Sequence, residues 1–302
     1  MKTALVPALL AACTLAACGG GGGGGGASAM RAPSSEQPPV TGSGTDLTAM
    51  STPTALTVGS VARMDTSAGA FTPAVTFSNA PTVRIAIPAL GVDDTFTQAD
   101  VVSTNVIAGV QIPTARRSDA QGVRTLTYIV PSNGPSGLRF SSLGIWDRAD
   151  LTTGTINQQA AISFGTRTAG GDIPTTGTAT YSGFLLGNAT ELGGKQFSIS
   201  ALASATADFG ARSVALSSTG SGKTDRATGV LVSDPGYNVT GTLTYAAGAN
   251  ALSGTVSSTN GKTGSAAGTF YGPQAAELGV TFSLANGASA TPFVGGAALK
   301  RQ

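Results

Sequence analysis

The second half of the chain alternates apolar and polar residues in short runs separated by turn signals. In one run Leu278, Val280, Phe282 and Leu284 share a face, while the residues between them are small or polar. A period of two predicts a β-strand with one buried face. Eight such segments follow one another, the count of a small closed barrel: 178–187, 197–209, 212–218, 239–246, 251–257, 265–271, 278–285 and 293–299.

The expected barrel is antiparallel and filled by its own side chains. Val239, Gly241, Leu243 and Tyr245 share one face of their segment, and small residues of this kind can fill a narrow barrel without leaving a channel. Turn signals join the segments as hairpins. They lie at 193–194, 220–222, 234–236, 260–261 and 286–287.

Shorter strand-like runs precede the barrel, at 74–77, 82–87, 124–130 and 141–146. The last holds Trp146, the only tryptophan, and a lone tryptophan is more often a core residue than a ligand platform. The chain is therefore expected to be all-β, with a smaller, irregular β region before the C-terminal barrel. We expect a signal peptide at 1–17, a flexible Gly/Ser/Pro-rich linker at 18–60, the smaller β region at 61–155 and the barrel at 156–302.

A membrane-spanning barrel is the competing architecture, since it alternates in the same way. Such barrels usually carry aromatic girdles, whereas only 6% of these residues are aromatic and the sequence ends in Lys300-Arg301-Gln302. A barrel outside the bilayer is the better interpretation.

The N-terminus reads as an export signal. An apolar run from 4 to 15 is too short to span a bilayer, which takes about 20 residues, and it ends in Leu-Ala-Ala-Cys. This resembles a bacterial lipobox, with cleavage after Ala17 and a diacylglycerol on the Cys18 sulfur. The new amine would carry an acyl chain such as palmitate. Cys13 is a second match, but it leaves a shorter apolar run that contains a proline.

A glycine run from Gly19 to Gly26 follows the lipobox and suits a tether. Several acyl chains would give stable membrane attachment, so the lipid on Cys18 is the one cofactor expected. Cleavage before Cys18 would also remove Cys13, so no disulfide is expected. Gly19 rather than an aspartate after the cysteine fits sorting to the outer membrane.

Composition narrows the function classes. The chain has no histidine, a net charge of +2 and only 11% charged residues. Histidine-based triads, histidine-ligated metals and a phosphate-tracking basic surface are therefore excluded or disfavoured. We expect no enzyme, no metal site and no nucleic-acid partner.

Three local patterns invite a chemical interpretation and are weak. Residues 220–224 end like a phosphate-binding loop but lack its first glycine, so a hairpin turn is expected. Asp93, Asp94 and Asp100 lack the spacing of a calcium loop and are interpreted as solvated loop acids. The five tyrosines form no evident iron-binding set.

The turn at Gly272-Pro273, within 268–284, resembles a signature of the transferrin-binding-protein-like β-barrel domain of bacterial surface lipoproteins. Segments 172–183, 206–210 and 293–296 resemble other strands of that domain. Val280 departs from the pattern, which commonly has a glycine there. The resemblance implies an eight-stranded barrel and a handle-like region on a surface lipoprotein.

Relatives in this family bind host transferrin, haemoglobin or a complement regulator through variable loops. The resemblance thus implies a monomeric, surface-exposed outer-membrane lipoprotein that binds a host protein, such as an iron carrier, or a solute, in iron or nutrient acquisition. No ligand-binding residue can be assigned from it. The alternative is a structural or adhesive outer-membrane lipoprotein without a small-molecule ligand.

Overall fold

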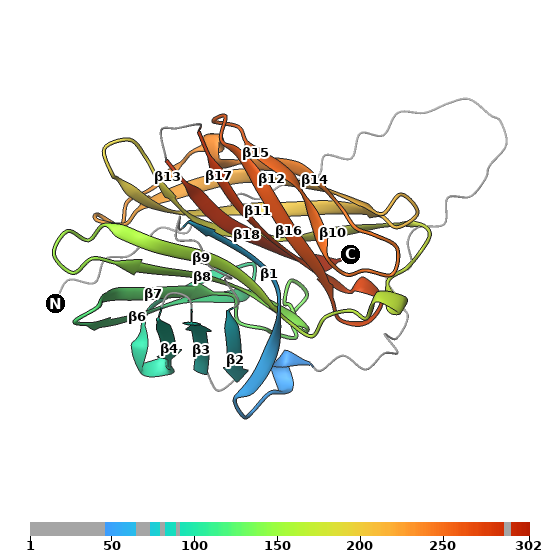
Figure 1. Ribbon diagram of the computed structural model, residues 1–302, viewed down its shortest axis with the longest axis horizontal. Coiled ribbons are helices and arrows are strands. Elements are labelled where there is room, and N and C mark those ends of the chain that lie inside the picture. The colour runs from blue at the N-terminus through green and yellow to red at the C-terminus, as the bar shows by residue number, and fades with distance from the viewer. Residues whose placement is uncertain (1–45, 65–72, 79–81, 89–90, 287–290) are drawn as a thin grey trace, which may run out of the picture. The chain divides into compact units, whose positions relative to one another are not determined.

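The computed structural model describes residues 46–64, 73–78, 82–88, 91–286 and 291–302. All of them fall in one compact unit, Val40–Gln302. The described residues form two antiparallel sheets and a few single 3-10 turns (Figure 1). The all-β class expected from the alternation is confirmed.

The first sheet has nine strands in the order β4-β3-β2-β1-β9-β8-β7-β6-β5. Its β1 spans both halves of the sheet, pairing with β2 near its start and with β9 over the rest. The bounds are β1 (Thr54–Met64), β2 (Ala74–Ser78), β3 (Thr82–Ile87), β4 (Val92–Phe96), β5 (Val101–Ile107), β6 (Val110–Asp119), β7 (Gly122–Tyr128), β8 (Ser141–Ala149) and β9 (Ile156–Gly165).

The second sheet closes into a barrel, because β11 pairs with both β10 and β12. Each of the eight segments expected from the sequence becomes one of its eight ring strands, and the three-residue β13 is added beside β12. The bounds are β10 (Thr178–Thr190), β11 (Gln196–Asp208), β12 (Ser213–Asp225), β13 (Leu231–Ser233), β14 (Val239–Thr244), β15 (Leu252–Ser258), β16 (Thr263–Tyr271), β17 (Glu277–Ala285) and β18 (Phe293–Arg301).

Short 3-10 turns punctuate the sheets: η1 (Leu47–Ala49), η3 (Gln98–Asp100), η4 (Gly170–Asp172), η5 (Pro235–Tyr237) and η6 (Pro273–Ala275). The last of these, η6, begins directly after Gly272. Gly272 has a φ of 69°, and a Cβ there would collide with the Phe140 ring. Only glycine adopts this positive φ without strain, and only a residue without a side chain leaves room for Phe140.

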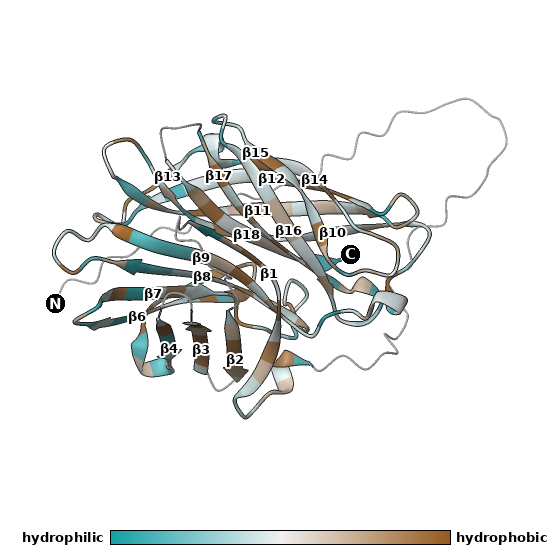
Figure 2. Cartoon of the chain, viewed as in Figure 1, coloured by the Kyte–Doolittle hydropathy of each residue, from teal (hydrophilic) through white to brown (hydrophobic). Residues whose placement is uncertain are grey.

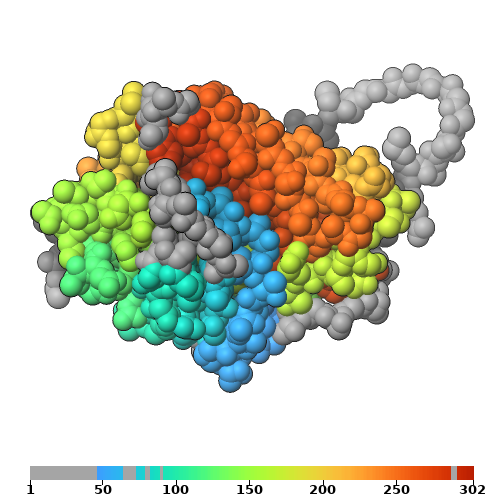
Figure 3. Space-filling model, in the orientation of Figure 1, coloured from blue at the N-terminus to red at the C-terminus, as the bar shows by residue number. Residues whose placement is uncertain are grey.

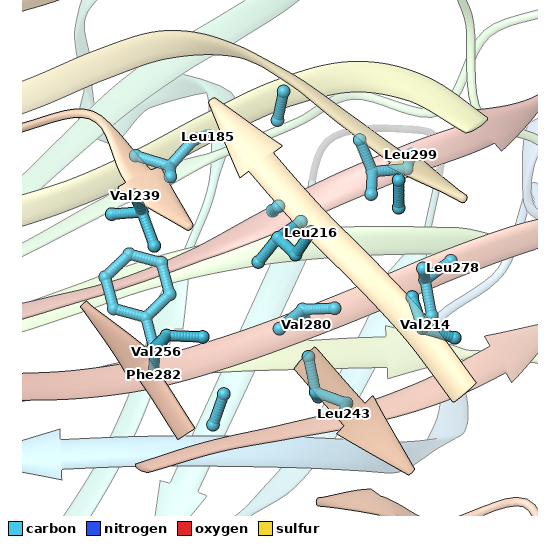
Figure 4. Packing of buried hydrophobic residues seen from close by; sticks show 14 of the residues in the cluster. Leu185, Val214, Leu216, Val239, Leu243, Val256, Leu278, Val280, Phe282 and Leu299 are labelled. Atoms are coloured by element: carbon cyan, nitrogen blue, oxygen red, sulfur yellow. The ribbon is translucent and has the colours of Figure 1, made fainter. Parts of the chain in front are cut away.

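The barrel interior is a continuous apolar core. Val280, Phe282 and Leu284 are at most 1% exposed, as their predicted shared face required, and Phe270 of the preceding strand is fully buried beside them. Figure 4 shows Val280 and Phe282 among side chains of neighbouring strands. Edge-on ring contacts order the centre, such as Phe282 against Phe293 at 5.1 Å between centroids. The alternation of apolar and polar colour along the barrel strands is visible in Figure 2.

The first sheet has a core of its own and a second apolar face against the barrel wall. Trp146 is fully buried in the first core, so its predicted packing role is confirmed. Leu143 and Ile145, on the opposite face of β8, pack instead with Phe184 and Leu186 of the barrel. The alternation along β8 thus serves two cores at once, which is why its residues are buried along almost the whole strand.

Two strand positions differ from the sequence expectation. β1 begins at Thr54, inside the segment expected to be linker, and β9 belongs to the first sheet although its residues were assigned to the barrel region. The turn expected at 220–222 is wrong: β12 continues through it, with a bulge in its pairing to β11 between Ser200 and Leu202. A glycine inside a strand marks a bulge as readily as a turn.

Candidate binding cleft

Two neighbouring cavities lie where the first sheet meets the outer wall of strands β10 to β12. Their volumes are about 580 Å³ and 320 Å³. Arg116, Thr125, Asp225 and Arg226 line both, so we treat the pair as one cleft. Its size is within the range of small-ligand pockets. In Figure 3 the hairpin tips around it, coloured green and yellow, lie at the left of the view.

A buried ion pair holds Arg226, which lines both cavities. Arg226, which follows β12, donates from both terminal nitrogens to Asp147 of β8, at 2.8 and 3.0 Å. Asn188 of β10 donates from Nδ2 to the same carboxylate at 3.0 Å. Asp147 is 1% exposed, and a buried carboxylate needs such a set of donors. Three strands from two sheets are thereby held together.

Three hairpin tips surround this ion pair, and acidic side chains order two of them. Asp225 accepts from the backbone N–H groups of Thr228 and Ala227, and these bonds lower the pKa of its carboxyl. Asp150, at the tip between β8 and β9, accepts from Thr153 and Thr152 in the same way, and its pKa is lowered too. Turns closed by aspartate in this manner are local and rigid.

The third tip, between β10 and β11, ties to its neighbours through the backbone. The N–H of Arg226 donates to the carbonyl of Gln196 at 3.0 Å. The Gln196 amide, in its hydrogen-bonded orientation, contacts the backbone of Gly154 and Ile156. The loops around the cleft are therefore linked to one another and to the sheets.

Two exposed cationic side chains lie along the rim of the cleft. Arg116 of β6 is exposed, and its side chain makes no ion pair or hydrogen bond with the described residues. Lys195 is also exposed and lies close enough to Asp225 to lower its pKa slightly. The carboxylates of Asp147 and Asp225 are engaged by protein donors, so the chemistry that the cleft offers a ligand is mainly cationic and hydroxyl-rich.

The mouth of the barrel beside these tips carries a second polar cluster. Lys223 pairs with Glu191 at 2.6 Å and with Asp234 at 3.0 Å, and its ammonium lies 4.7 Å from the Phe197 ring centroid. The hydrogen bond to Glu191 raises the lysine pKa. Burial, with Glu191 nearby, raises the pKa of Tyr237, whose hydroxyl donates to the same carboxylate. The cluster satisfies itself and needs no bound ion.

Lys262 is the second lysine at this mouth. It is 3% exposed, and its Nζ donates to the backbone oxygen and hydroxyl of Thr291. Burial lowers its pKa, because the charged form loses water, and the nearby carboxylate of Glu191 offsets only part of this effect.

A buried carboxylate joins the sheets at the other end of β8. Glu277, the first residue of β17, is 1% exposed. It accepts from the N–H of Arg139 at 2.6 Å, the N–H of Phe140 at 3.1 Å and the hydroxyl of Ser141 at 2.7 Å. Burial raises its pKa to about 7 despite these three donors. Nearby, the hydroxyls of Ser163 and Tyr271 lie 2.8 Å apart, a second polar contact between the sheets.

The predicted lipidation and cleavage residues, Cys18 and Ala17, lie outside the described residues. The aspartates weighed as a cation site do not gather around a common point. Asp93 pairs with Arg84 on the surface, and Asp100 caps η3. Asp94 contradicts the expectation of a solvated loop acid.

Asp94 lies in β4 and is 3% exposed. It accepts from the Trp146 indole at 3.0 Å and pairs with Arg124 at 3.0 Å. Burial raises its pKa. Alternation along β4 turns it inward, where a carboxylate is stable only because these two partners meet it there.

Other predicted features fare differently. Residues 220–224 form part of a strand, so the phosphate-loop resemblance has no turn behind it. Tyr181 and Tyr245 meet around Phe270 in the core, with centroids 6.2 and 5.6 Å from it, as packing residues. Within the described ranges, no three acidic or cysteine side chains come together as metal ligands. None of the described helices is long and apolar enough to cross a membrane.

Sequence reasoning missed Asp147, Asn188 and Arg226. Asn188 lies 41 residues and Arg226 79 residues after Asp147, and none of the three belongs to a sequence motif. One weak signal is an aspartate directly after the run from Leu143 to Trp146, which contains no polar side chain. A charge in such a run implies a partner.

Residues 173–298 match the family model of the C-lobe and N-lobe β-barrels of transferrin-binding protein B. The match covers the ring of strands β10 to β18 up to Ala298. Over these residues the barrel is similar to the barrels of transferrin-binding protein B. No curated protein matches the chain.

Solved structures resemble the chain at low identity. A tryptophan-to-alanine mutant of the vaccine antigen transferrin-binding protein B from Haemophilus parasuis is 14% identical, with coverage of 76% of this chain and 53% of that one and a TM-score of 0.45. The isotype 1 protein from serogroup B Neisseria meningitidis is 17% identical, with coverage of 76% of this chain and 52% of that one and a TM-score of 0.42. A surface lipoprotein is 11% identical, with coverage of 73% of this chain and 93% of that one and a TM-score of 0.36. The chain spans about half the length of the transferrin-binding protein B structures that it matches.

Proposed function

We propose that the chain is a surface-tethered outer-membrane lipoprotein that acts as a binding module for a host protein or solute, in iron or nutrient acquisition. In this proposal the signal peptide ends at Ala17 and a lipid on Cys18 provides the anchor. The barrel type supports the role, because the solved proteins of this type are named for binding transferrin. A host iron carrier is accordingly the first partner to test. The module would act as a monomer.

The observation that carries the proposal is the cleft with its rigid rim. Asp147 and Arg226 hold strands of both sheets in fixed positions, and the tips around them are ordered by their own backbone bonds. Arg116 and Lys195 remain at the rim without a full complement of partners. Recognition sites commonly combine such a rigid scaffold with loop-borne polar groups.

The test is capture by the full chain, immobilised through its N-terminus, from serum and from solutions of transferrin, haemoglobin or haem. We expect saturable binding of one of these by the parent. We also expect its loss in a double variant, Arg116→Glu with Lys195→Glu. Arg212→Glu is the matched control, since Arg212 is exposed in the turn between β11 and β12, at the other end of the barrel.

Binding that survives the double variant would place the site elsewhere. Absence of any saturable ligand would favour the second candidate, a structural or adhesive lipoprotein. That candidate has its own support in the exposed apolar side chains beside the cleft. Val230, Leu231 and Val232 are 58, 64 and 45% exposed, a composition more suited to protein contact than to a small solute.

A further inference from the structure

Strand β5 is an open edge of the first sheet, and it borders the cleft. It stands last in the sheet order, with β6 as its one partner strand among the described residues. Val102 and Val106 on β5 are 58 and 65% exposed. An exposed edge with apolar side chains is a template for another strand.

The register shows which backbone groups of β5 are unpaired. A two-residue turn joins Ile107 to Val110, so the pairs Ile107–Val110 and Asn105–Ile112 exchange hydrogen bonds across the ladder. Thr104 and Val106 alternate with these residues and direct their N–H and C=O groups away from β6. These groups are available to a further strand.

The other edge strand of the sheet, β4, is protected against pairing with a further strand, whereas β5 is not. In β4, Asp93 presents a charge paired with Arg84, and Asp94 points inward toward Trp146. Charged and inward-pointing acidic residues are a common way to block edge pairing. β5 has no charged residue and no proline; its irregularity is a bulge near Val102.

The cleft continues the surface that an added strand would cover. Ser103, Asn105 and Ile107 of β5 line its smaller cavity, facing Ser198 and Ser200 on the barrel wall. A strand beside β5 would therefore direct alternate side chains toward that wall. Leu202, 58% exposed, is the next outward residue on β11 and offers an apolar contact.

Charge indicates what kind of strand fits. Arg116 of β6 lines both cavities and has no acidic partner among the described residues, while Arg226 is already neutralised by Asp147. An acidic side chain on the added strand would pair with Arg116. We propose that β5 and the cleft bind an extended, acidic polypeptide segment of a partner protein by adding it to the sheet as a strand. This inference rests on the proposed binding function and names its partner class.

The test selects short random peptides displayed on phage against the full chain. We expect enriched peptides that alternate β-branched and polar residues and contain an aspartate or glutamate. Val106→Pro should weaken their binding about tenfold, because it removes an outward N–H that the β5–β6 ladder does not use. Val106→Thr, which keeps that N–H, should bind nearly as the parent does. Arg116→Glu should abolish the preference for acidic peptides, and Arg116→Lys should retain it.

Hydrogen exchange provides a readout that a folding defect would not mimic. A bound peptide should slow exchange at the amides of Thr104 and Val106, and unchanged thermal unfolding of Val106→Pro shows that the fold is kept. Equal peptide binding by Val106→Pro, no enrichment of peptides, or no slowing at these amides would overturn the inference. Serum capture separates the two proposals. If Val106→Pro captures the serum ligand as well as the parent does, strand addition at β5 is rejected and the binding function stands. If peptides bind but no serum ligand is captured, the proposed function is rejected and strand addition stands.

Discussion

Replacing Glu277 tests how the barrel and the first sheet are joined. In Glu277→Ala the N–H groups of Arg139 and Phe140 and the hydroxyl of Ser141 lose their acceptor. Each buried donor left without a partner costs about 1–3 kcal/mol. We expect a loss of roughly 3–5 kcal/mol in the free energy of unfolding at about pH 5, measured by chemical denaturation. Hydrogen exchange at Arg139 and Phe140 should quicken first, because their acceptor is gone.

The pH dependence gives a sharper test through Glu277→Gln. Burial raises the pKa of Glu277 to about 7, above the ordinary 4.5. The folded state therefore holds its proton more tightly than the unfolded state. The stability linked to this proton is fully present below about pH 4.5 and is lost as pH rises through about 7. The total is about 3 kcal/mol, since one pKa unit corresponds to about 1.4 kcal/mol.

The glutamine variant has no proton to lose in this range. The difference in unfolding free energy between parent and Glu277→Gln should therefore shift by about 3 kcal/mol in favour of the variant between about pH 4.5 and pH 8.5. A difference that stays constant, or shifts toward the parent, would refute the reasoning. It would mean that the three donors outweigh burial and keep the carboxylate ionised throughout.

Three further predictions follow from other contacts. Labelled palmitate should be incorporated into the parent and into Cys13→Ser but not into Cys18→Ser, and incorporation into the last would contradict the predicted lipid site. Arg226→Ala should lower the unfolding free energy by about 3–5 kcal/mol, since it leaves Asp147 buried without its cation, whereas replacing both by leucine should recover most of the loss. Denaturation curves of the three proteins decide this, and equal losses in the single and double variants would contradict it. Trp146→Phe should cost about 1–3 kcal/mol, because Asp94 loses its indole donor, and a neutral effect in the same assay would show that Arg124 alone satisfies the carboxylate.

The sequence predicted the barrel well because one physical rule governs its strands. A closed barrel filled by its own side chains has an apolar inner face on every strand, so the sequences of β14 and β17 alternate apolar with small or polar residues. The Gly-Gly signal at 193–194 and the Asn-Gly signal at 260–261 then placed two of its hairpins, whereas the turn predicted at 286–287 extends beyond the described residues. The failure at 220–222 came from the same cue, since glycine permits a bulge within a strand as well as a turn between strands.

The first sheet was harder to predict because its strands obey different rules. β5 is almost fully exposed along its length, so no apolar period marks it. β8 is buried on both faces, so its run could not show which side faces which core. β1 starts within a segment rich in threonine and proline, whose composition resembles a linker. Local pattern identifies a strand most readily when apolar residues alternate with small or polar ones.

The cleft could not be predicted, because its residues belong to no local pattern and meet only through the placement of one sheet on the other. β8 shows what sets that placement. Its first residue, Ser141, donates to Glu277 of β17, and Asp147 near its end is held by Arg226 after β12. Between them lies apolar packing, which is tolerant of sliding. A buried ion pair or a buried hydrogen-bonded carboxyl adds little stability compared with apolar packing of the same volume, but each penalises every register in which a buried polar group loses its partner. We therefore infer that the two ties fix where the first sheet lies on the barrel wall, and with it the width of the cleft.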